Sequence, residues 1–233
     1  MSPLTITTLS TLLYCSQVIS STPFPLSDRP TLKYGTAWKE DRTANLVYRA
    51  ILNGFRHVDT ACQPRHYNEA GVGEGWTRAA QELQLNREDL WLQTKFSSLD
   101  AQDPENTPYD RNAPLEDRVR QSLDVSLNNL QTDYLDSWVM HGPEKNWDDN
   151  FKVWRTMEEG VDDGKVRQLG ISNWYRLEDI EWLYDHARIK PKVSFFLTNN
   201  YTVIFLSMVY FIVCVCNIVL RVTFQGCSKS FLL

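Results

Sequence analysis

The sequence has 233 residues, of which 42% are hydrophobic and 12% aromatic, and its formal net charge is -5 at neutral pH. This composition is typical of a globular chain long enough to bury one sizeable core. A mildly acidic chain without clustered Lys and Arg is a poor candidate for binding nucleic acid, which needs basic side chains against phosphate. The five scattered cysteines do not suggest a disulfide framework, and the four histidines show no HExxH spacing, so no metal site is predicted.

The chain begins with a segment that shows no regular pattern. Residues 1–22 are apolar and rich in Ser and Thr, but they contain no Lys or Arg. A secretory signal starts with positive charge, so we expect residues 1–30 to form an irregular tail. From residue 31 onward, short apolar runs alternate with amphipathic helices. Strands are predicted at 32–36, 55–59, 90–96, 135–140 and 166–171, and helices around 46–51, 71–83, 114–130, 151–161 and 177–187.

Start and stop signals support these helices. Asn53-Gly54 follows the first helix and Gly164 follows the fourth, as is typical of helix ends. Pro114 opens the third helix, where proline is well tolerated. Apolar residues recur in that helix at helical spacing: Leu115, Val119, Leu123, Leu127 and Leu130.

Five strand–helix units in strict alternation predict a parallel sheet with right-handed crossovers. An open doubly wound sheet and a (β/α)8 barrel both satisfy this pattern. No GxGxxG follows the first strand, as a dinucleotide-binding doubly wound sheet would require. Polar, reactive residues instead end successive strands, which is where barrel enzymes place their chemistry: Asp59, Lys95, His141 and Ser172.

We therefore predict an α/β fold, namely an incomplete (β/α)8 TIM barrel of about five β/α units. A complete barrel needs ~250 residues, whereas the alternation here stops near residue 192. The expected division is an irregular tail over 1–30, a partial barrel over 31–192 and a different, hydrophobic segment over 193–233.

Five segments in order carry a resemblance to one family. The segment from Gly54 to Ala61 (GFRHVDTA), followed by Tyr67-Asn-Glu69, resembles the signature of the aldo-keto reductases. Four further segments agree with the family in the same order: YGTAW at 34–38, LQTKF at 92–96, DSWVMH at 136–141 and GKVRQLGISNW at 164–174. The resemblance covers residues 31 to about 192, and five matching segments in order make a chance match improbable.

The resemblance implies an NADP-dependent oxidoreductase that reduces a small aldehyde or ketone to an alcohol. It implies Tyr67 as the proton donor, Lys95 as its modulator and Asp59 as the partner of Lys95. It also implies that His141 hydrogen-bonds the substrate oxygen. A phenol with a pKa of ~10 is a weak acid near neutrality, a neighbouring ammonium lowers that pKa, and a carboxylate keeps the ammonium charged. We expect these four side chains to meet at one end of the sheet.

The resemblance also implies contacts to the nicotinamide end of NADPH, from Thr36, Trp38, Asp59, Ser172 and Asn173. Trp38 and Trp174 either line the pocket or pack in the core.

The insert Cys62–Arg65 lengthens the connection from Asp59 to Tyr67. It makes the position of Tyr67 harder to predict. It also makes His66 a rival proton donor beside Tyr67.

The segment after residue 192 does not resemble the family. Val193–Leu220 carries no charged residue and is rich in Val, Ile and Phe. One interpretation is a transmembrane helix over about 198–220, since ~20 apolar residues span a bilayer, with the preceding basic residues on the cytoplasmic side. The other is translated non-coding sequence, because Val193-Ser194 is what an intron start, GTAAGT, would encode. We favour the second, and both predict an apolar helix with little contact to the barrel.

The family's motifs for the pyrophosphate and adenosine ends of the coenzyme are absent after Val193. We therefore expect a C-terminally truncated, cytoplasmic reductase whose activity is lost or impaired. The alternative is a non-catalytic aldo-keto-reductase-like protein with a binding or regulatory role, which the tail could anchor in a membrane. The oligomeric state is left open, and a coenzyme-binding assay distinguishes the two functions.

Overall fold

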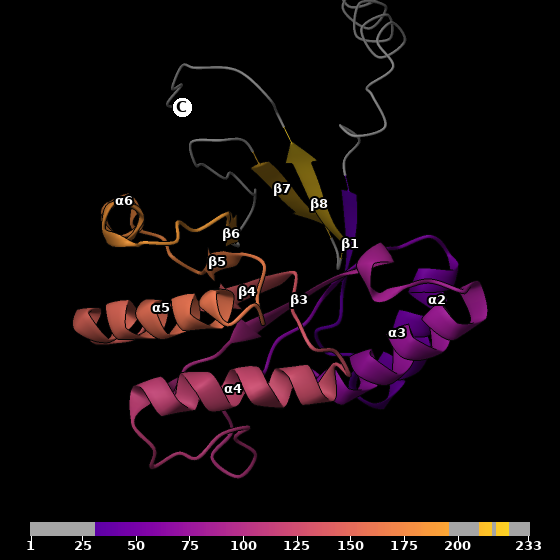
Figure 1. Cartoon of the computed structure of the whole chain (residues 1–233), viewed down its shortest axis with the longest axis horizontal. Helices are drawn as coiled ribbons and strands as arrows, with labels where there is room; N and C mark the ends of the chain where they lie inside the picture. The colour runs from indigo at the N-terminus through magenta and orange to yellow at the C-terminus, as the bar shows by residue number, and fades with distance from the viewer. Residues whose placement is uncertain (1–30, 196–209, 216–217, 224–233) are drawn as a thin grey trace, which may run out of the picture.

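The computed structural model describes residues 31–195, 210–215 and 218–223. Within them, strands and helices alternate along the chain (Figure 1). The strands are β1 (Thr31–Gly35), β2 (His57–Asp59), β3 (Trp91–Phe96), β4 (Ser137–Met140), β5 (Leu169–Ser172), β6 (Val193–Phe195), β7 (Tyr210–Val215) and β8 (Ile218–Thr223). The α-helices are α2 (Thr43–Leu52), α3 (Glu69–Leu83), α4 (Leu115–Asn129), α5 (Trp147–Asp162) and α6 (Leu177–His186), and short 3-10 helices are η2 (Glu40–Arg42), η3 (Arg87–Asp89) and η4 (Leu99–Ala101).

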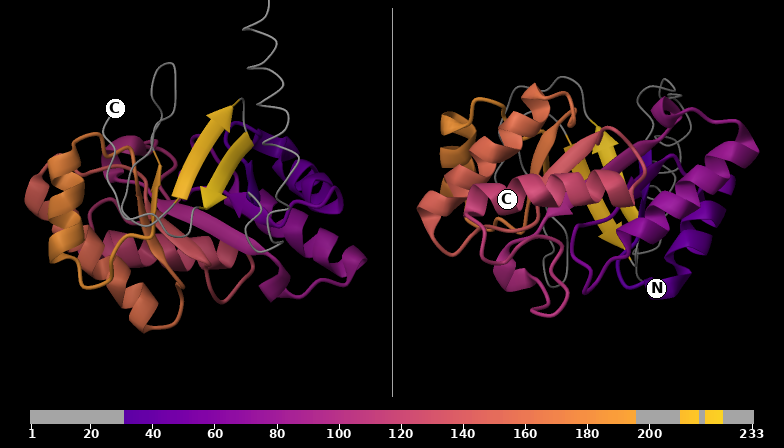
Figure 2. Two further views of the ribbon diagram at one scale, coloured as in Figure 1. Left: turned by 90° about the horizontal axis from the view of Figure 1, so that it is seen from above. Right: turned by 60° about the horizontal axis from the view of Figure 1, so that its bottom comes forward.

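The five predicted strand–helix units are confirmed. Strands β1 to β6 pair in parallel in chain order, and each helix from α2 to α6 connects one strand to the next. In Figure 1, α4 and α5 cross the lower part of the molecule below the strands, and the hairpin of β7 and β8 lies above them. Figure 2 shows the helices around the outside of a curved sheet. The arrangement is the parallel α/β architecture expected of a partial (β/α)8 barrel.

The predicted helix ends are also found. Gly54 and Gly164, which follow α2 and α5, have φ values of +94° and +73°, a backbone region that glycine adopts without steric cost. Pro114 lies at the N-cap of α4. The side chain of Asn68 caps α3 by accepting a hydrogen bond from the Gly71 amide at 2.8 Å.

The apolar helix predicted over about 198–220 is wrong for the residues that the structure describes there. Tyr210–Val215 and Ile218–Thr223 are strands, which pair antiparallel with each other, and β8 also pairs antiparallel with β1. The physical reason is that β-branched residues favour strands and that the edge of β1 offers unpaired backbone groups. Residues 198–209 and 216–217, and the tail over 1–30, lie outside the described residues.

The described part of the chain contains no helix that is long and apolar enough to cross a bilayer. After α6 the chain forms β6, which pairs in parallel with β5 through Gly170, Ile171 and Ser172. The sixth strand therefore starts at Val193, which is where the family-like pattern was expected to break off.

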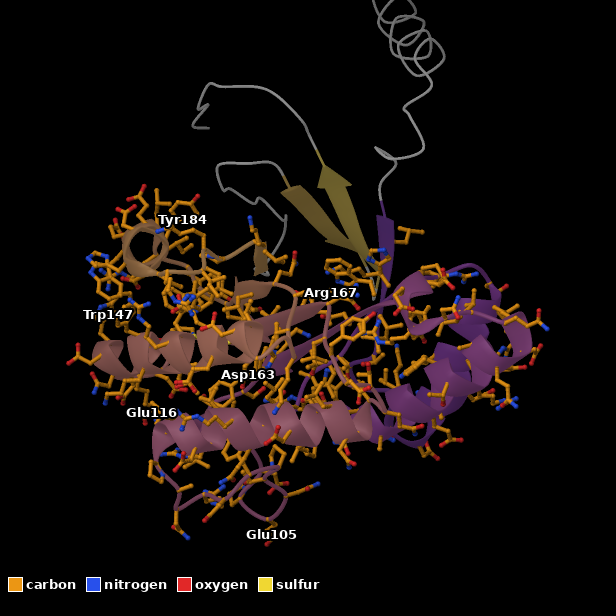
Figure 3. The ribbon with its side chains drawn as sticks, in the orientation of Figure 1. Glu105, Glu116, Trp147, Asp163, Arg167 and Tyr184 are labelled. Carbon is orange, nitrogen blue, oxygen red and sulfur yellow. The ribbon has the colours of Figure 1, made fainter. Side chains whose placement is uncertain are left out.

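One face of β3 points toward the helices, and the other face points toward the inside of the curved sheet, where the candidate site lies. Successive side chains of a strand point to opposite faces, and every residue from Leu92 to Phe96 is buried. Thr94 bonds Glu69 of α3, so its face meets the helices. Gln93 and Lys95 lie on the other face, inside the curve of the sheet. Side chains fill the space between strands and helices (Figure 3), and this core includes Val47, Ile51, Val72, Trp76, Leu92, Phe96, Leu123, Trp138, Trp154, Met157 and Leu183.

Candidate active site

The structure brings the four candidate catalytic side chains together at the carboxyl ends of β2, β3 and β4. Asp59 ends β2, Lys95 lies near the end of β3, His141 directly follows β4 and Tyr67 lies just before α3. Lys95 Nζ lies 2.8 Å from Asp59 Oδ2 and 5.1 Å from the centroid of the Tyr67 ring. The ring centroids of Tyr67 and His141 are 6.0 Å apart, in an edge-to-face arrangement. These side chains therefore form one cluster, as the order of strands predicts.

Lys95 is a buried cation with two close acceptors. Its ammonium donates to Asp59 Oδ2 at 2.8 Å and to the Thr60 carbonyl at 2.7 Å. Burial acts to lower the pKa of Lys95, but the Asp59 carboxylate, followed by Tyr67, acts in the opposite direction, and the pKa is raised overall. Lys95 therefore stays positively charged at neutral pH, beside the Tyr67 ring.

Two further polar residues continue this ion pair across the inner face of the sheet. Gln93 Nε2 donates to Asp59 Oδ1 at 2.6 Å, and Lys33 Nζ donates to Gln93 Oε1 at 2.8 Å. All three side chains are buried. The amide of Gln93 can thus face a carboxylate with its donor and an ammonium with its acceptor, which fixes its orientation. The Gln93 amide therefore helps to hold the Asp59 carboxylate that Lys95 needs.

Sequence reasoning did not select Gln93 or Lys33. The sequence did contain a signal for both residues. Gln93 lies two residues before Lys95, and Lys33 lies two residues before Gly35, the last residue of β1. Residues two apart in a strand point to the same face of the sheet. A polar residue on an inward face of a predicted barrel strand needs a polar partner. That partner is on another strand and only the register of β1, β2 and β3 identifies it.

The insert before Tyr67 is anchored to the loop that follows β3. Gln63 Nε2 donates to the Ala101 carbonyl at 2.7 Å, and Gln102 Nε2 donates to the Cys62 carbonyl at 2.8 Å. Asn68, next to Tyr67, caps α3. The longer connection therefore still places the Tyr67 ring beside Lys95.

His66, the rival proton donor, is engaged elsewhere. Its ring lies against Trp38, with centroids 4.1 Å apart, and its Nδ1 is 3.0 Å from Gln63 Oε1. Because an amide oxygen only accepts, this contact requires a proton on Nδ1. Burial, together with the charge of Arg65, lowers the pKa of His66, so the ring is neutral near pH 7.

His141 is a neutral imidazole held at both its ring and its backbone. Burial and then the Lys95 ammonium lower its pKa to about 3. Its Nδ1 lies 2.7 Å from Ser97 Oγ. Its backbone amide donates to the Phe96 carbonyl at 2.8 Å, and its carbonyl accepts from Asn173 Nδ2 at 2.7 Å. The ring can therefore offer a hydrogen bond but is not an acid at neutral pH.

The low pKa of His141 predicts a loss of stability in acid. An unfolded histidine titrates near ~6.5, so between that pH and about 3 the unfolded chain binds a proton that the folded chain does not. The free energy of unfolding should therefore fall as pH falls through this window, by at most ~1.4 kcal/mol per pH unit from this group.

Urea unfolding at several pH values, with His141→Gln as the comparison, isolates this contribution. The pKa of Glu144 is raised to about 7 by burial, which gives an opposite slope, but both proteins share that slope and it cancels in the difference. The variant should lose stability less steeply than the wild type below pH 6.5. Equal slopes in the two proteins would show that His141 is not a buried neutral ring.

The candidate coenzyme residues surround the same end of the sheet. The Thr36 hydroxyl donates to the Asp59 carbonyl at 3.0 Å, and Ser172, at the end of β5, is buried. Asn173 has a φ of +59°, and its Oδ1 accepts from the Tyr175 hydroxyl at 3.0 Å. A carboxamide presents one acceptor and two donors. The hydroxyl of Ser172 and the amide of Asn173 have both functions, so the residues present fit the nicotinamide end of a coenzyme.

The two tryptophans considered for the pocket differ sharply. Trp38 is 63% exposed and lies against His66, whereas Trp174 is 2% exposed and packs against Trp147 with ring centroids 5.8 Å apart. Trp174 is therefore a core residue, and Trp38 remains available to a ligand. Within the described residues, no group of three or more His, Cys, Asp or Glu side chains could hold a metal ion.

A buried ion pair, a tyrosine ring and a neutral imidazole thus lie together at the carboxyl ends of parallel strands, the end at which barrel enzymes place their chemistry. The family comparison agrees. The chain belongs to the aldo/keto reductase family, whose model matches residues 31–207, more than half of the chain.

Individual relatives support the assignment. The glyoxal reductase of Bacillus subtilis is 36% identical over 149 residues, covering 64% of this chain and 46% of that protein. The NAD(P)H-dependent D-xylose reductase of Pachysolen tannophilus is 32% identical over 180 residues, covering 66% and 51%. The chain spans about half the length of the curated relatives that it matches.

Solved structures show the same fold. The aldose reductase from Schistosoma japonicum superposes with a TM-score of 0.57 at 27% identity, covering 70% of this chain and 56% of that one. An aldo-keto reductase of Bombyx mori in complex with NADP gives 0.56 at 27% identity, with coverages of 71% and 53%.

Proposed function

We propose that this site reduces an aldehyde or ketone to an alcohol with NADPH as the hydride donor. The observation that carries the proposal is the buried Lys95–Asp59 pair, 2.8 Å apart, directly beside the Tyr67 ring. Reduction of a carbonyl requires a proton donor for oxygen, and a phenol beside a fixed ammonium suits that role. Family membership and the NADP complex of the Bombyx mori relative support the coenzyme.

The coenzyme and three side chains have separate roles in this proposed reaction. NADPH, when bound, supplies the hydride to the carbonyl carbon. The Tyr67 hydroxyl donates its proton to the carbonyl oxygen, and Lys95, held charged by Asp59, stabilises the phenolate that is left. His141 donates a hydrogen bond to the same oxygen and orients it. The pKa of His141, about 3, favours Tyr67 over His141 as the acid.

Thr36, Trp38, Asp59, Ser172 and Asn173 are proposed to contact the nicotinamide end of the coenzyme. We further propose that the 233 residues alone hold NADPH weakly, since the phosphate-binding motifs of the family do not occur after Val193. Losing three charge-assisted hydrogen bonds at ~1.5–3 kcal/mol each weakens binding by several powers of ten.

The test is to express residues 1–233, titrate the protein with NADPH by fluorescence, and assay a broad panel of aldehydes. We expect the fluorescence change not to saturate at micromolar NADPH. We expect the aldehydes to be reduced only slowly at millimolar NADPH. Tyr67→Phe should lower that rate by ~10²-fold or more because the proton donor is lost. Tyr184→Phe is the matched control and should leave the rate unchanged, because Tyr184 lies on α6 and takes part in none of the site contacts given above.

The possible outcomes separate the parts of this proposal. Micromolar binding with turnover that Tyr67→Phe abolishes would support the reductase site and contradict the weak binding. Turnover that survives Tyr67→Phe would contradict the role of Tyr67. Micromolar binding without any turnover would favour a non-catalytic, coenzyme-binding protein instead.

A further inference from the structure

We propose that Ser97 is a positioning residue that holds His141 in the tautomer with its proton on Nε2, so that the ring donates a hydrogen bond toward the substrate oxygen. Only the catalytic consequence of this inference rests on the proposed function. The tautomer itself is a property of the protein without coenzyme or substrate. Ser97 is the residue after β3, on the loop that leads away from Lys95.

The contact that carries the inference is short and buried. Ser97 Oγ lies 2.7 Å from His141 Nδ1, and Ser97 is fully buried. A neutral imidazole has one N–H donor and one bare nitrogen acceptor, so the role of Nδ1 toward its partner decides whether Nε2 carries the proton. The two ring nitrogens therefore cannot be assigned independently of Ser97.

The direction of this hydrogen bond follows from the partners of the serine hydroxyl. Among the hydrogen bonds of the described residues, Ser97 Oγ takes part only in the one to His141. If Nδ1–H donated to Ser97, the serine proton would be buried without an acceptor, which costs ~1–3 kcal/mol. If Ser97 donates to Nδ1, its proton is satisfied. The second arrangement is favoured, and it places the ring proton on Nε2.

Ser97 is itself fixed on the side away from the ring. Its carbonyl accepts from the Tyr109 hydroxyl at 2.8 Å and from Gln102 Nε2 at 3.3 Å. His141 is fixed by its backbone bonds to Phe96 and Asn173. The backbones of both residues in the 2.7 Å contact are thus held by separate hydrogen bonds, which keep Ser97 and the His141 ring next to each other.

The Nε2–H tautomer is the one that the chemistry needs. A carbonyl oxygen accepts hydrogen bonds and donates none, so a bare Nε2 would repel it. With Nε2–H, His141 and the Tyr67 hydroxyl present two donors to one oxygen. Ser97 would then act on the substrate through His141 without touching it.

The direct test is nitrogen-15 NMR of the histidine rings in the 1–233 chain, without ligands, at pH 7. Long-range proton–nitrogen correlations distinguish a protonated Nδ1 from a protonated Nε2. The chain has four histidines, and the signals missing in His141→Gln identify the ring concerned. We expect a single Nε2–H tautomer for His141. A protonated Nδ1 would overturn the proposal from the wild-type spectrum alone.

Variants show whether Ser97 is the cause. Ser97→Ala should convert the His141 signals to those of a mixture of tautomers, and Ser97→Thr, which keeps the hydroxyl, should restore the Nε2–H form. Ser98→Ala is the matched control, because Ser98 is the next residue and its side chain makes no capping hydrogen bond to η4. An unchanged His141 spectrum in a folded Ser97→Ala protein would contradict the proposal.

The catalytic consequence is measured separately. Where the wild-type chain reduces an aldehyde at millimolar NADPH, Ser97→Ala should lower kcat by ~10–100-fold, as the loss of a ring-orienting partner does at metal sites, while the NADPH titration is unchanged. A mixed tautomer with unaltered kcat would contradict the catalytic role of Ser97. A wild-type chain without turnover would contradict the proposed function but leave the tautomer result valid.

Discussion

Replacing Asp136 with Ala should lower the free energy of unfolding by ~3–5 kcal/mol, since breaking a buried ion pair from one side leaves uncompensated charge. Asp136 is 1% exposed and lies just before β4, at the opposite end of the strand from His141. Its Oδ2 accepts from Arg87 Nη2 at 2.8 Å, and its Oδ1 accepts from Arg167 Nη1 at 2.9 Å.

The carboxylate of Asp136 connects three strands through these bonds. Its Oδ2 also accepts from the Leu92 amide of β3 at 2.9 Å, and Arg167 precedes β5. Both guanidinium groups lie 4.1 Å from the centroid of the Tyr134 ring. Alanine would leave a buried amide and the Arg87 guanidinium without this acceptor, which is why the loss exceeds that of a surface pair. Arg167 is labelled in Figure 3.

Urea unfolding measures the effect, because a lower unfolding midpoint with an unchanged m value reports a lower free energy of unfolding. Asp124→Ala is the control, because its pair with Lys165 is 2.9 Å long but its side chain is 64% exposed. Exposed pairs contribute ~0–1 kcal/mol, so this variant should unfold close to the wild type. If Asp136→Ala also lost less than ~1 kcal/mol, the buried carboxylate would not be what joins these strands.

Gly73→Ala should destabilise the protein by ~3 kcal/mol or more, at the upper end of what overpacking usually costs. A Cβ at Gly73 would lie 2.1 Å from the Asn129 carbonyl oxygen, which is backbone and cannot rotate away. The α3 helix would have to move away from the end of α4. That movement would also break the 2.6 Å bond from Trp76 Nε1 to the Leu130 carbonyl.

The same displacement should reach the site, because α3 begins just after Tyr67. Glu69, in the first turn of α3, accepts from Ser126 of α4 at 2.9 Å, so the two helices are also joined there. Thermal unfolding of Gly73→Ala and Gly142→Ala tests the argument. A Cβ at Gly142 would meet its nearest atom at 3.9 Å, an ordinary contact. Similar melting temperatures for both variants would contradict the close approach of α3 and α4.

Hydrophobic periodicity predicted most of the fold correctly because it is a local property. The apolar positions of α4 and α5 recur at helical spacing, and Gly54 and Gly164 end helices through positive-φ conformations that glycine adopts without steric cost. The helix predicted over 198–220 is wrong where the structure describes that segment, because strands lie there. A charge-free run rich in β-branched residues suits a helix in lipid or a strand against an open edge, and the edge of β1 decides between them.

The sequence by itself determined the alternation of strands and helices and the position of Asp59, Lys95 and His141 at strand ends, because spacing and end signals are encoded locally. Only the tertiary structure decided which polar groups meet. Lys33 reaches Gln93, Gln93 reaches Asp59, and Ser97 reaches His141 across separate strands and loops. Such partners are far apart in the chain, and the strand register and the packing of loops bring them within hydrogen-bond distance.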